Sequence, residues 1–366
     1  SYDLGHDGTF THKEEWGKAF DFMVLDEDGK SYKSTGLHCA NYYCYGKPVT
    51  APADGIVIDI VDNIEDNEIG QVNTTQNWGN SIILQHITGV YSQLSHLKKH
   101  SFKVSKGDFV KFGDVLAQCG NSGRSPYPHL HFQIQESPVL GSKTSDYPIS
   151  YYLNCKTKKL EQFSRPVEKD MISNLHQNPF MFKAFNIFPD TTLKFSYTDR
   201  SGKQKIEHWD AYTDAFNLKY LYSRETEAVA YYTCDNMMFY FTAFYGSRKS
   251  LLYYFFLTAY KVLLAESEIM VKDNVPVHLL NSNKGINSLN DFTAPFFNFV
   301  KAGYAEKTTK IDHVLDTTAI ELSTEITVST LGRKAQNMKG TIKINHEGIS
   351  SFTYVSGKKV IHAKSI

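Results

Sequence analysis

Short β-like segments follow one another between about residue 48 and residue 135. Gly55–Val61, Ser81–His86 and Gly89–Leu94 are rich in β-branched and aromatic residues and are bounded by turn residues, which is typical of strands. The short break between the last two segments predicts a hairpin. His129–Gln135 predicts a further strand, so the pattern indicates an antiparallel all-β domain.

Polar segments around these strands predict loops. Residues 1–45 are polar and irregular apart from the apolar cluster Ala19–Val24, in which we expect a short strand. Asp62–Trp78 is rich in Asn, Asp, Gln and Thr and predicts a long loop. Loops of that length in a compact domain are often functional.

The pattern changes after about Cys155. Lys156–Asp170 is charged and predicts a linker, and short aromatic-rich strands recur from Thr192 onward. Leu251–Ala265 is apolar but too short to cross a membrane, so we interpret it as buried sheet. We therefore predict no membrane span in the chain.

The last part of the chain mixes polar and β-like segments. Leu279–Asn290 is polar and predicts a loop, and Asp291–Ala302 predicts a short helix. Gly340–Ile344 and Ser350–Val355 predict strands around a turn at residues 346–348. We find no catalytic motif in this half of the chain.

Composition is consistent with two globular domains. The chain has 366 residues, of which 41% are hydrophobic and 14% aromatic, enough to form two cores. We predict an all-β protein with an antiparallel domain over residues 1–158. A β-rich accessory domain, sandwich or barrel, follows over residues 159–366.

The charge balance narrows the class of partner. The chain has 39 Lys and Arg against 39 Asp and Glu, and its formal net charge is zero. With no basic excess, we expect no nucleic-acid partner. The chain begins at Ser1 rather than Met, so we expect a processed or trimmed product from which any signal peptide has been lost.

The cysteines do not determine the compartment. There are five, an odd number, and their spacings match no zinc finger. Cys39 and Cys44 are close enough in sequence to form a local disulfide in an oxidising compartment. Buried free thiols explain them equally well, and the sequence leaves both interpretations open.

The motif His129-Leu130-His131 is the first candidate for chemistry. Alternate residues of a strand share a face, so both imidazoles point the same way while Leu130 turns into the core. Two neighbouring imidazoles can bind a metal, or can divide into one ligand and one acid or base. The motif is short, and its context has to distinguish these roles.

A carboxylate upstream adds to this signal. Asp21 lies between Phe20 and Phe22 in a segment with the pattern of a buried strand. An unpaired buried carboxylate is very costly, so Asp21 needs a cation or strong hydrogen bonds. A catalytic zinc ion would compensate it, and such an ion takes three protein ligands and a water. His12 precedes the same strand as a second candidate ligand.

Five short blocks in a fixed order extend this pattern. They are Gly46–Gly55, Gly79–Ile83, Ser95–Leu97, Val104–Gly113 and Gly120–Phe132. In this order they resemble the G-x-P-V-x-A-x-x-D-G, G-N-x-V-x-I, H-L, V-x-x-G-x-x-V-x-x-G and G-N-[ST]-G-x-S…H-L-H-F patterns of the lysostaphin-like (LytM-type) zinc metalloendopeptidases. These bacterial enzymes cleave peptides in peptidoglycan. The resemblance covers about residues 12–135.

The resemblance implies a role for each of five residues. His12, Asp21 and His131 correspond to the family's three zinc ligands, which implies one zinc ion per chain. His96 and His129 correspond to its two catalytic histidines. They would take a proton from the zinc-activated water, stabilise the oxyanion or protonate the leaving amine.

The chain departs from the family pattern in three places. Eight residues separate His12 from Asp21, where many members have three, so His6 is an alternative ligand. Leu94 stands where many members have a tyrosine, so one groove contact is missing or comes from elsewhere. Ser31–Tyr45 looks like an inserted loop.

Two polar residues near the blocks are candidates for a substrate groove. Asn80 is placed to line the groove, and Arg124 is placed to contact a substrate carboxylate. The resemblance does not assign either residue a role.

The sequence thus predicts a zinc endopeptidase that cleaves stem peptides or cross-links of peptidoglycan in the cell envelope, either periplasmic or extracellular. The alternative is a non-catalytic relative that binds cell wall or regulates another hydrolase, although the retention of all five residues favours catalysis. A biotin- or lipoyl-carrier hairpin at Gly107–Gly113 lacks the required lysine tripeptide. The second domain could bind wall polymer, cover the groove or contact a protein, and the oligomeric state stays open.

Overall fold

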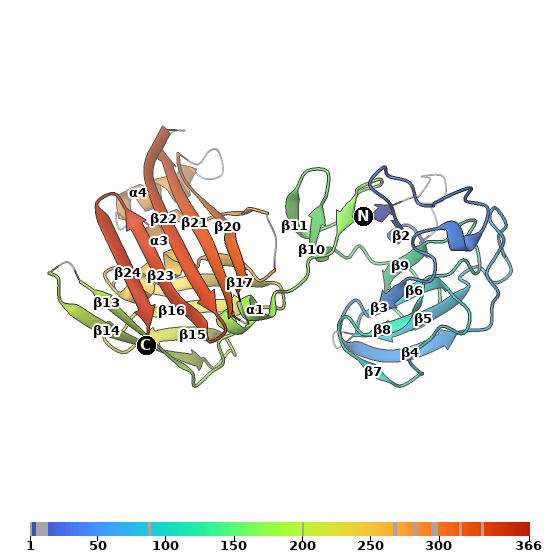
Figure 1. The fold of residues 1–366 in the computed structure, drawn as a ribbon, viewed down its shortest axis with the longest axis horizontal. Helices are drawn as coiled ribbons and strands as arrows, with labels where there is room; N and C mark the ends of the chain where they lie inside the picture. Colours follow the sequence, from blue (N-terminus) through green and yellow to red (C-terminus); the bar gives the residue numbers. More distant parts are fainter. Residues whose placement is uncertain are drawn as a thin grey trace. The chain divides into compact units, whose positions relative to one another are not determined.

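The computed structural model describes residues 2–4, 14–86, 89–199, 201–265, 269–280, 284–293, 299–314, 317–330 and 333–366. These residues form two compact units, Ser1–Asn174 and Leu175–Ile366, and each is described here by itself (Figure 1). Strands dominate both units, and neighbouring strands are antiparallel throughout the described sheets. The predicted all-β fold class is therefore confirmed.

The N-terminal unit is built on a ten-stranded sheet with the order β11-β10-β12-β1-β2-β9-β6-β5-β4-β7. Its strands are β1 (Tyr2–Leu4), β2 (Phe20–Val24), β4 (Gly55–Val61), β5 (Asn80–Gln85), β6 (Tyr91–Leu97), β7 (Phe109–Val110), β9 (Leu130–Gln135), β10 (Ile149–Asn154), β11 (Lys159–Ser164) and β12 (Ile172–Ser173). A second, two-stranded sheet pairs β3 (Pro48–Thr50) with β8 (Val115–Gln118), and a short 3-10 helix covers Cys39–Asn41.

Several local predictions for this unit are confirmed. The strand over Gly55–Val61 and the hairpin formed by β5 and β6 are present, and β9 covers most of the predicted strand over His129–Gln135. The predicted linker over Lys156–Asp170 is wrong, because this segment contains β11, which pairs with β10 in the main sheet. Its charged residues lie on an edge strand, where one side of the ladder faces solvent.

The central strands β5, β6 and β9 are buried on both faces, and the two faces differ in chemistry. One face carries Ile82, Leu84 and Leu94, which belong to the hydrophobic core of the unit. The other face carries buried serine and glutamine side chains that hydrogen-bond one another. On that face Gln93 Nε2 donates to Ser95 Oγ at 2.8 Å. A polar face of this kind is stable only because its groups are paired.

The C-terminal unit contains a single twelve-stranded sheet with the order β18-β17-β16-β15-β14-β13-β24-β23-β22-β21-β20-β19. Its strands are β13 (Thr192–Thr198), β14 (Gln204–Thr213), β15 (Lys219–Ser223), β16 (Val229–Cys234), β17 (Met238–Tyr245), β18 (Lys261–Leu263), β19 (Val271–Asn274), β20 (Val300–Val314), β21 (Thr317–Thr330), β22 (Arg333–Asn345), β23 (Gly348–Ser356) and β24 (Lys359–Ser365). Its helices are α1 (Pro179–Phe185), α2 (Leu251–Thr258), α3 (Val277–Leu280) and α4 (Lys284–Thr293).

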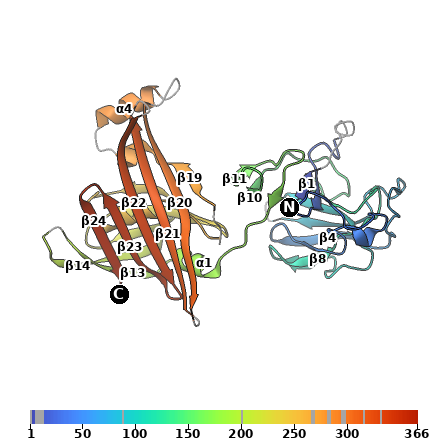
Figure 2. The same ribbon diagram turned by 45° about the horizontal axis from the view of Figure 1, so that its top comes forward.

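This sheet curves until it is nearly barrel-shaped, as Figures 1 and 2 show. The terminal strands of the order, β18 and β19, are joined by an ion pair between Lys261 Nζ and Asp273 Oδ2 at 2.7 Å. In Figure 2, α4 lies at one end of the long strands β20, β21 and β22. The predicted β-rich second half is thus confirmed, in the form of a curved sheet.

The apolar run Leu251–Ala265, which we predicted to be buried sheet, is mostly helix. Leu251–Thr258 forms α2, every residue of which is buried, and only Lys261–Leu263 forms a strand. Ser250 caps the helix by accepting a hydrogen bond from the Leu252 N–H. A short apolar run has the same pattern in a buried helix as in a buried strand, so the sequence alone could not separate them.

Two further predictions near the end of the chain are wrong. The expected loop over Leu279–Asn290 contains the end of α3 and most of α4, and the helix expected over Asp291–Ala302 ends at Thr293. The strands expected around residues 346–348 are confirmed as parts of β22 and β23. In the described parts of the chain, no helix is long and apolar enough to span a membrane.

All five cysteines are free thiols. Cys39 Sγ donates to the Asn67 carbonyl at 3.3 Å, and Cys44 Sγ donates to the Pro128 carbonyl at 3.0 Å. The sequence left open a Cys39–Cys44 disulfide or free thiols, and the structure agrees with free thiols.

Glu306 in β20 gives the C-terminal unit a predicted pH dependence. Its side chain is buried, and burial raises the pKa of this carboxyl to about 8. Between about pH 4.5 and 8 the folded chain keeps a proton that the unfolded chain releases, so the free energy of unfolding falls as pH rises. The slope in this window is at most about 1.4 kcal/mol per pH unit. We expect the Glu306→Gln substitution to remove this dependence of the free energy of unfolding on pH.

The measurement is denaturant unfolding of the full chain between pH 5 and 8, followed by hydrogen exchange of β20 peptides. Glu347→Gln is the matched control, because that side chain is exposed in the turn between β22 and β23. An unchanged slope in Glu306→Gln would contradict the assignment.

Candidate active site

The pairing of three strands brings four of the five predicted site residues together. In the register of β2 with β9, Asp21 lies opposite His131, and in that of β6 with β9, Ser95 lies opposite His131. His96 follows Ser95, and His129 immediately precedes β9. The ring centroids of His96 and His129 are 4.7 Å apart, and those of His96 and His131 are 5.8 Å apart.

Asp21 is the centre of this cluster. Its Oδ1 lies 2.9 Å from Nδ1 of His131, and its Oδ2 lies 3.7 Å from Nε2 of His129. The three side chains are almost entirely buried, with exposed fractions of 14%, 4% and 8% for Asp21, His131 and His129. In such a site, electrostatic interactions are much stronger than in water.

His96 is held by an unusual backbone conformation. Its φ is +61°, in the left-handed region that residues other than glycine rarely occupy. The Gly120 N–H donates to the His96 carbonyl at 3.0 Å, and the His96 N–H donates to the Trp78 carbonyl at 3.2 Å. The backbone of His96 is therefore fixed by two loops as well as by its strand.

The ring of His96 is suited to accept a proton. Its Nδ1 lies 2.8 Å from the Ser122 carbonyl oxygen. A carbonyl only accepts, so in this contact Nδ1 is the N–H and Nε2 keeps its lone pair. Burial, together with the neighbouring His129 and His131, lowers the pKa of His96 well below its ordinary value, which keeps the ring neutral.

His129 has the same arrangement. Its Nδ1 lies 2.9 Å from the Tyr127 carbonyl oxygen and 3.1 Å from Ser125 Oγ. Nδ1 is therefore the donor to the carbonyl, and Nε2 is the nitrogen that faces Asp21. His129 thus turns Nε2, and His131 turns Nδ1, toward the Asp21 carboxylate.

The donor set is compatible with zinc. Imidazole nitrogen and carboxylate oxygen bind zinc at about 2.0–2.1 Å, so two ligands of a tetrahedral site lie about 3.4 Å apart. The 2.9 Å between His131 Nδ1 and Asp21 Oδ1 is within a small adjustment of that separation. His12 and its rival His6 lie outside the described residues, and no group of three metal-binding side chains occurs among the residues that are described.

Comparison with known proteins identifies this region. Residues 32–142 match the family model described as Peptidase family M23. The N-terminal unit carries an M23 peptidase domain. The lysostaphin-like resemblance predicted from the sequence is therefore confirmed.

Relatives of the M23 domain are found among curated proteins and solved structures. The chain is 39% identical over 118 residues to glycyl-glycine endopeptidase ALE-1 of Staphylococcus capitis, covering 30% of this chain and 29% of that protein. It is 35% identical over 82 residues to peptidoglycan DD-endopeptidase ShyB of Vibrio cholerae, covering 22% and 18%.

Among structures, the catalytic domain of lysostaphin from Staphylococcus simulans is 25% identical with a TM-score of 0.24, covering 35% of this chain and 74% of that chain. The chain spans less than a third of the length of the curated relatives that it matches.

The Asn80 side chain holds the backbone next to the M23 site in place. Its side chain is completely buried, and its Oδ1 accepts from the Ile64 N–H at 2.9 Å. Its Nδ2 donates to the carbonyls of Ile64 at 2.7 Å and Leu97 at 2.9 Å. Since Leu97 follows His96, these bonds fix the chain beside that residue, which gives Asn80 a supporting role.

Arg124 lies in an aromatic group next to the site. Its guanidinium lies 5.2 Å from the ring centroid of Trp16, a cation–π distance. Trp16 contacts Trp78 edge to face at 5.7 Å, and Trp78 lies 5.2 Å from the His131 ring. The proposed contact of Arg124 with a substrate carboxylate stays a prediction.

Sequence analysis missed three residues that shape the M23 site: Trp78, Ser122 and Gln133. Trp78 packs on the His131 ring, the Ser122 carbonyl orients His96, and Gln133 Oε1 lies 2.8 Å from His131 Nε2. Strand alternation could have revealed Gln133, because residues two apart share a face and Gln133 follows His131 at that spacing. The other two come from loops, whose positions no local pattern predicts.

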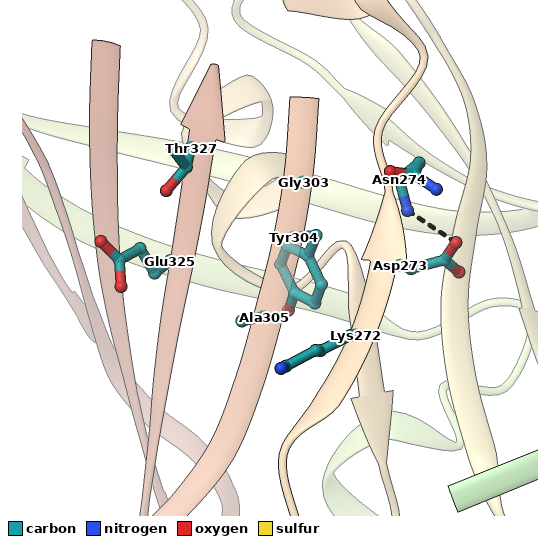
Figure 3. Close-up of a pocket in the computed structure, with 8 residues that line it drawn as sticks. All are labelled: Lys272, Asp273, Asn274, Gly303, Tyr304, Ala305, Glu325 and Thr327. Atoms are coloured by element: carbon teal, nitrogen blue, oxygen red, sulfur yellow. Dashed lines mark hydrogen bonds between the residues drawn. The ribbon is translucent and has the colours of Figure 1, made fainter. Parts of the chain in front are cut away.

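A pocket in the C-terminal unit has a different chemistry. It is lined by Lys272, Asp273, Asn274, Gly303, Tyr304, Ala305, Glu325 and Thr327 on β19, β20 and β21 (Figure 3). Figure 3 shows Asp273 and Glu325 at opposite sides, with β20 between them. The two carboxylates therefore do not converge as the M23 site residues do.

Asn80 provides a test of how the site is supported. Asn80→Leu removes a buried amide and its bonds to the Ile64 N–H and the Ile64 carbonyl, at a cost of about 1–3 kcal/mol each, while the Leu97 carbonyl still accepts from Ser122 Oγ. We expect a loss of about 3 kcal/mol or more in the free energy of unfolding, measured by urea denaturation. Gln71→Leu, in the exposed part of the preceding loop, is the control and should change it little. Equal midpoints for the two variants would contradict this role.

Proposed function

We propose that the M23 domain is a zinc-dependent endopeptidase that hydrolyses peptide bonds of bacterial peptidoglycan. The observation that carries this proposal is the convergence of Asp21, His96, His129 and His131 in one buried cluster, in which ring nitrogens of His129 and His131 face the Asp21 carboxylate. The names of the relatives, a glycyl-glycine endopeptidase and a peptidoglycan endopeptidase, support the substrate class.

In this proposal Asp21 and His131 hold the zinc ion, together with His12. Bound there, zinc would acidify a water molecule and polarise the scissile carbonyl. Asp21 supplies the negative charge that balances the ion, and the Trp78 ring shields His131 from solvent.

His96 and His129 perform the proton transfers. Because His96 Nδ1 donates to the Ser122 carbonyl, Nε2 keeps the lone pair that can take a proton from the attacking water. His129 presents Nε2 to the same space, where its protonated form would stabilise the oxyanion or pass a proton to the leaving amine. The backbone carbonyls of Ser122 and Tyr127 hold both rings in the required tautomer.

With this substrate class, we propose that the protein acts in the cell envelope, in the periplasm or outside the cell. The second candidate function is a non-catalytic domain that binds cell wall or regulates another hydrolase. The convergence of His96, His129 and His131 with Asp21 favours catalysis. For the C-terminal unit we propose an accessory role in contact with wall polymer or protein.

Zinc content and cleavage test the proposal together. Purified wild type should hold about one zinc per chain, and His131→Ala should lose it, as measured by elemental analysis after dialysis. His129→Ala should keep zinc but cleave defined muropeptides at least about 100-fold more slowly, because it lacks a proton-transfer group.

The control is His100→Ala, since His100 is an exposed histidine that lies near Asp62. It should keep both zinc and activity. A zinc-loaded wild type that cleaves no muropeptide would refute the enzyme and favour the binding function.

A further inference from the structure

We propose that Cys44 and Cys119 are a redox pair of the N-terminal unit, in which a disulfide forms reversibly between two buried thiols. The structure holds the pair in its reduced form. The disulfide would join the loop that precedes β3 to the residue that follows β8. The proposal concerns the thiols of this chain and rests neither on zinc nor on peptidase activity.

The two thiols come together from segments that are distant in sequence. Cys44 and Cys119 each have an exposed fraction of 3% and belong to the same hydrophobic core. Their side chains hydrogen-bond to one another. Thiols in such contact need only a small approach to reach the sulfur–sulfur bond length of about 2.05 Å.

The backbone on either side of the pair is fixed as well. The Gly46 N–H donates to the Cys119 carbonyl at 2.8 Å, and the Cys119 N–H donates to the Lys47 carbonyl at 2.9 Å. These two bonds hold the turn after Cys44 against the end of β8. The cysteines therefore stay neighbours in either redox state.

The contact between the thiols makes Cys44 the more reactive of the two. The Cys119 thiol beside it lowers the pKa of Cys44, whereas the same contact, together with burial, raises the pKa of Cys119. The thiolate is the attacking species in thiol–disulfide exchange. We therefore expect Cys44 to react first and Cys119 to complete the bond.

Cys39 is a less suitable partner for Cys44, although it is closer in sequence. Its Sγ donates to the Asn67 carbonyl at 3.3 Å. Burial, reinforced by the negative charge of Asp66, raises the pKa of Cys39 and so disfavours its thiolate. Of these two pairings of Cys44, the structure favours the one with Cys119.

The reaction needs an oxidant, for which a small-molecule disulfide, R–S–S–R, is sufficient. Cys44 loses its proton and attacks one sulfur of R–S–S–R, which breaks that bond and releases R–S⁻, protonated to R–SH. Cys119 then loses its proton and attacks the Cys44 sulfur, which forms the Cys44–Cys119 bond and releases the second R–SH. The two protein thiols lose two electrons, and these reduce R–S–S–R to two R–SH.

The exposed residues Lys47 and Pro48 follow Cys44 directly, so local opening of this turn gives the oxidant access.

The redox state of the pair changes contacts beside the M23 site. Gly120, which follows Cys119, donates its N–H to the His96 carbonyl at 3.0 Å. In the reduced pair Cys44 Sγ donates to the Pro128 carbonyl at 3.0 Å, directly before His129, and oxidation removes this donor. A cross-link between residues so far apart in sequence also restricts the unfolded chain strongly. The disulfide should therefore suppress opening of the backbone around β8.

The first test maps the pairing in the intact wild-type chain. The protein is incubated with oxidised glutathione, its remaining thiols are alkylated, and it is digested without reduction. Mass spectrometry should find the peptide with Cys44 linked to the peptide with Cys119, and dithiothreitol should separate them. A Cys39–Cys44 link, or Cys44 and Cys119 left alkylated or bound to glutathione, would overturn the proposal.

The second test measures local opening by amide hydrogen exchange of peptides that cover residues 115–119. Oxidation of the wild type should slow this exchange by about 30- to 1,000-fold. Cys119→Ala cannot form the bond, so oxidant should leave its exchange unchanged. Cys234→Ala is the matched control, because it removes a thiol of the C-terminal unit and should respond as the wild type does.

Two results of the exchange measurement would contradict the proposal. One is a response of Cys119→Ala to oxidant as large as that of the wild type. The other is equal exchange in the linked and the reduced wild type. The mapping experiment needs no variant, so it decides the pairing even if Cys119→Ala does not fold.

Discussion

The antiparallel pairing of β2 with β9 is the constraint on which the site depends. It sets Asp21 opposite His131, while Phe20 and Phe22 pack together with Phe132, at ring distances of 5.7 to 6.4 Å. Side chains alternate along a strand, so a shift of one residue would move the carboxylate to the aromatic side. Packing of the phenylalanine rings therefore fixes the position of the charge.

The site also requires a polar surface inside the protein, which is stable only if it is fully paired. Ser81, Ser95 and Gln93 on β5 and β6, and Gln133 and Gln135 on β9, bond mainly to one another and to loop carbonyls. Each bond contributes little, but any buried polar group left unpaired would cost about 1–3 kcal/mol. Full pairing makes the layer rigid, and rigidity keeps the histidine rings in place.

Glu207 and Glu306, two of the buried carboxylates that the structure describes in the C-terminal unit, have different surroundings. Glu207 lies at the start of α2, where it accepts from the Leu251 and Leu252 N–H groups and from Trp209 Nε1. A helix N-terminus stabilises a negative charge, so this acid anchors the buried helix to β14. Glu306 lies in a strand without such a terminus, and there burial dominates its pKa.

The sequence by itself determined the main outline of the N-terminal unit. Period-two alternation and turn residues predicted β4, the β5–β6 hairpin and β9, and the ordered motifs predicted the family and which histidines would meet Asp21. Strand alternation is a local property of the sequence, so it can be recognised without knowledge of the fold. The roles of the site residues stay predictions, and His12 lies outside the described residues.

Only the tertiary structure decided the features that depend on distant neighbours. The apolar run at Leu251 becomes a helix because Ser250 and Glu207 cap it, and Glu207 lies far away in sequence. Lys156–Asp170 joins the sheet because β10 offers it a free edge. The Gln133 side chain beside His131 is held by the Ser142 carbonyl, which lies beyond the end of β9. The partners of a buried side chain are groups that are distant in sequence, so no local sequence pattern predicts its hydrogen bonds.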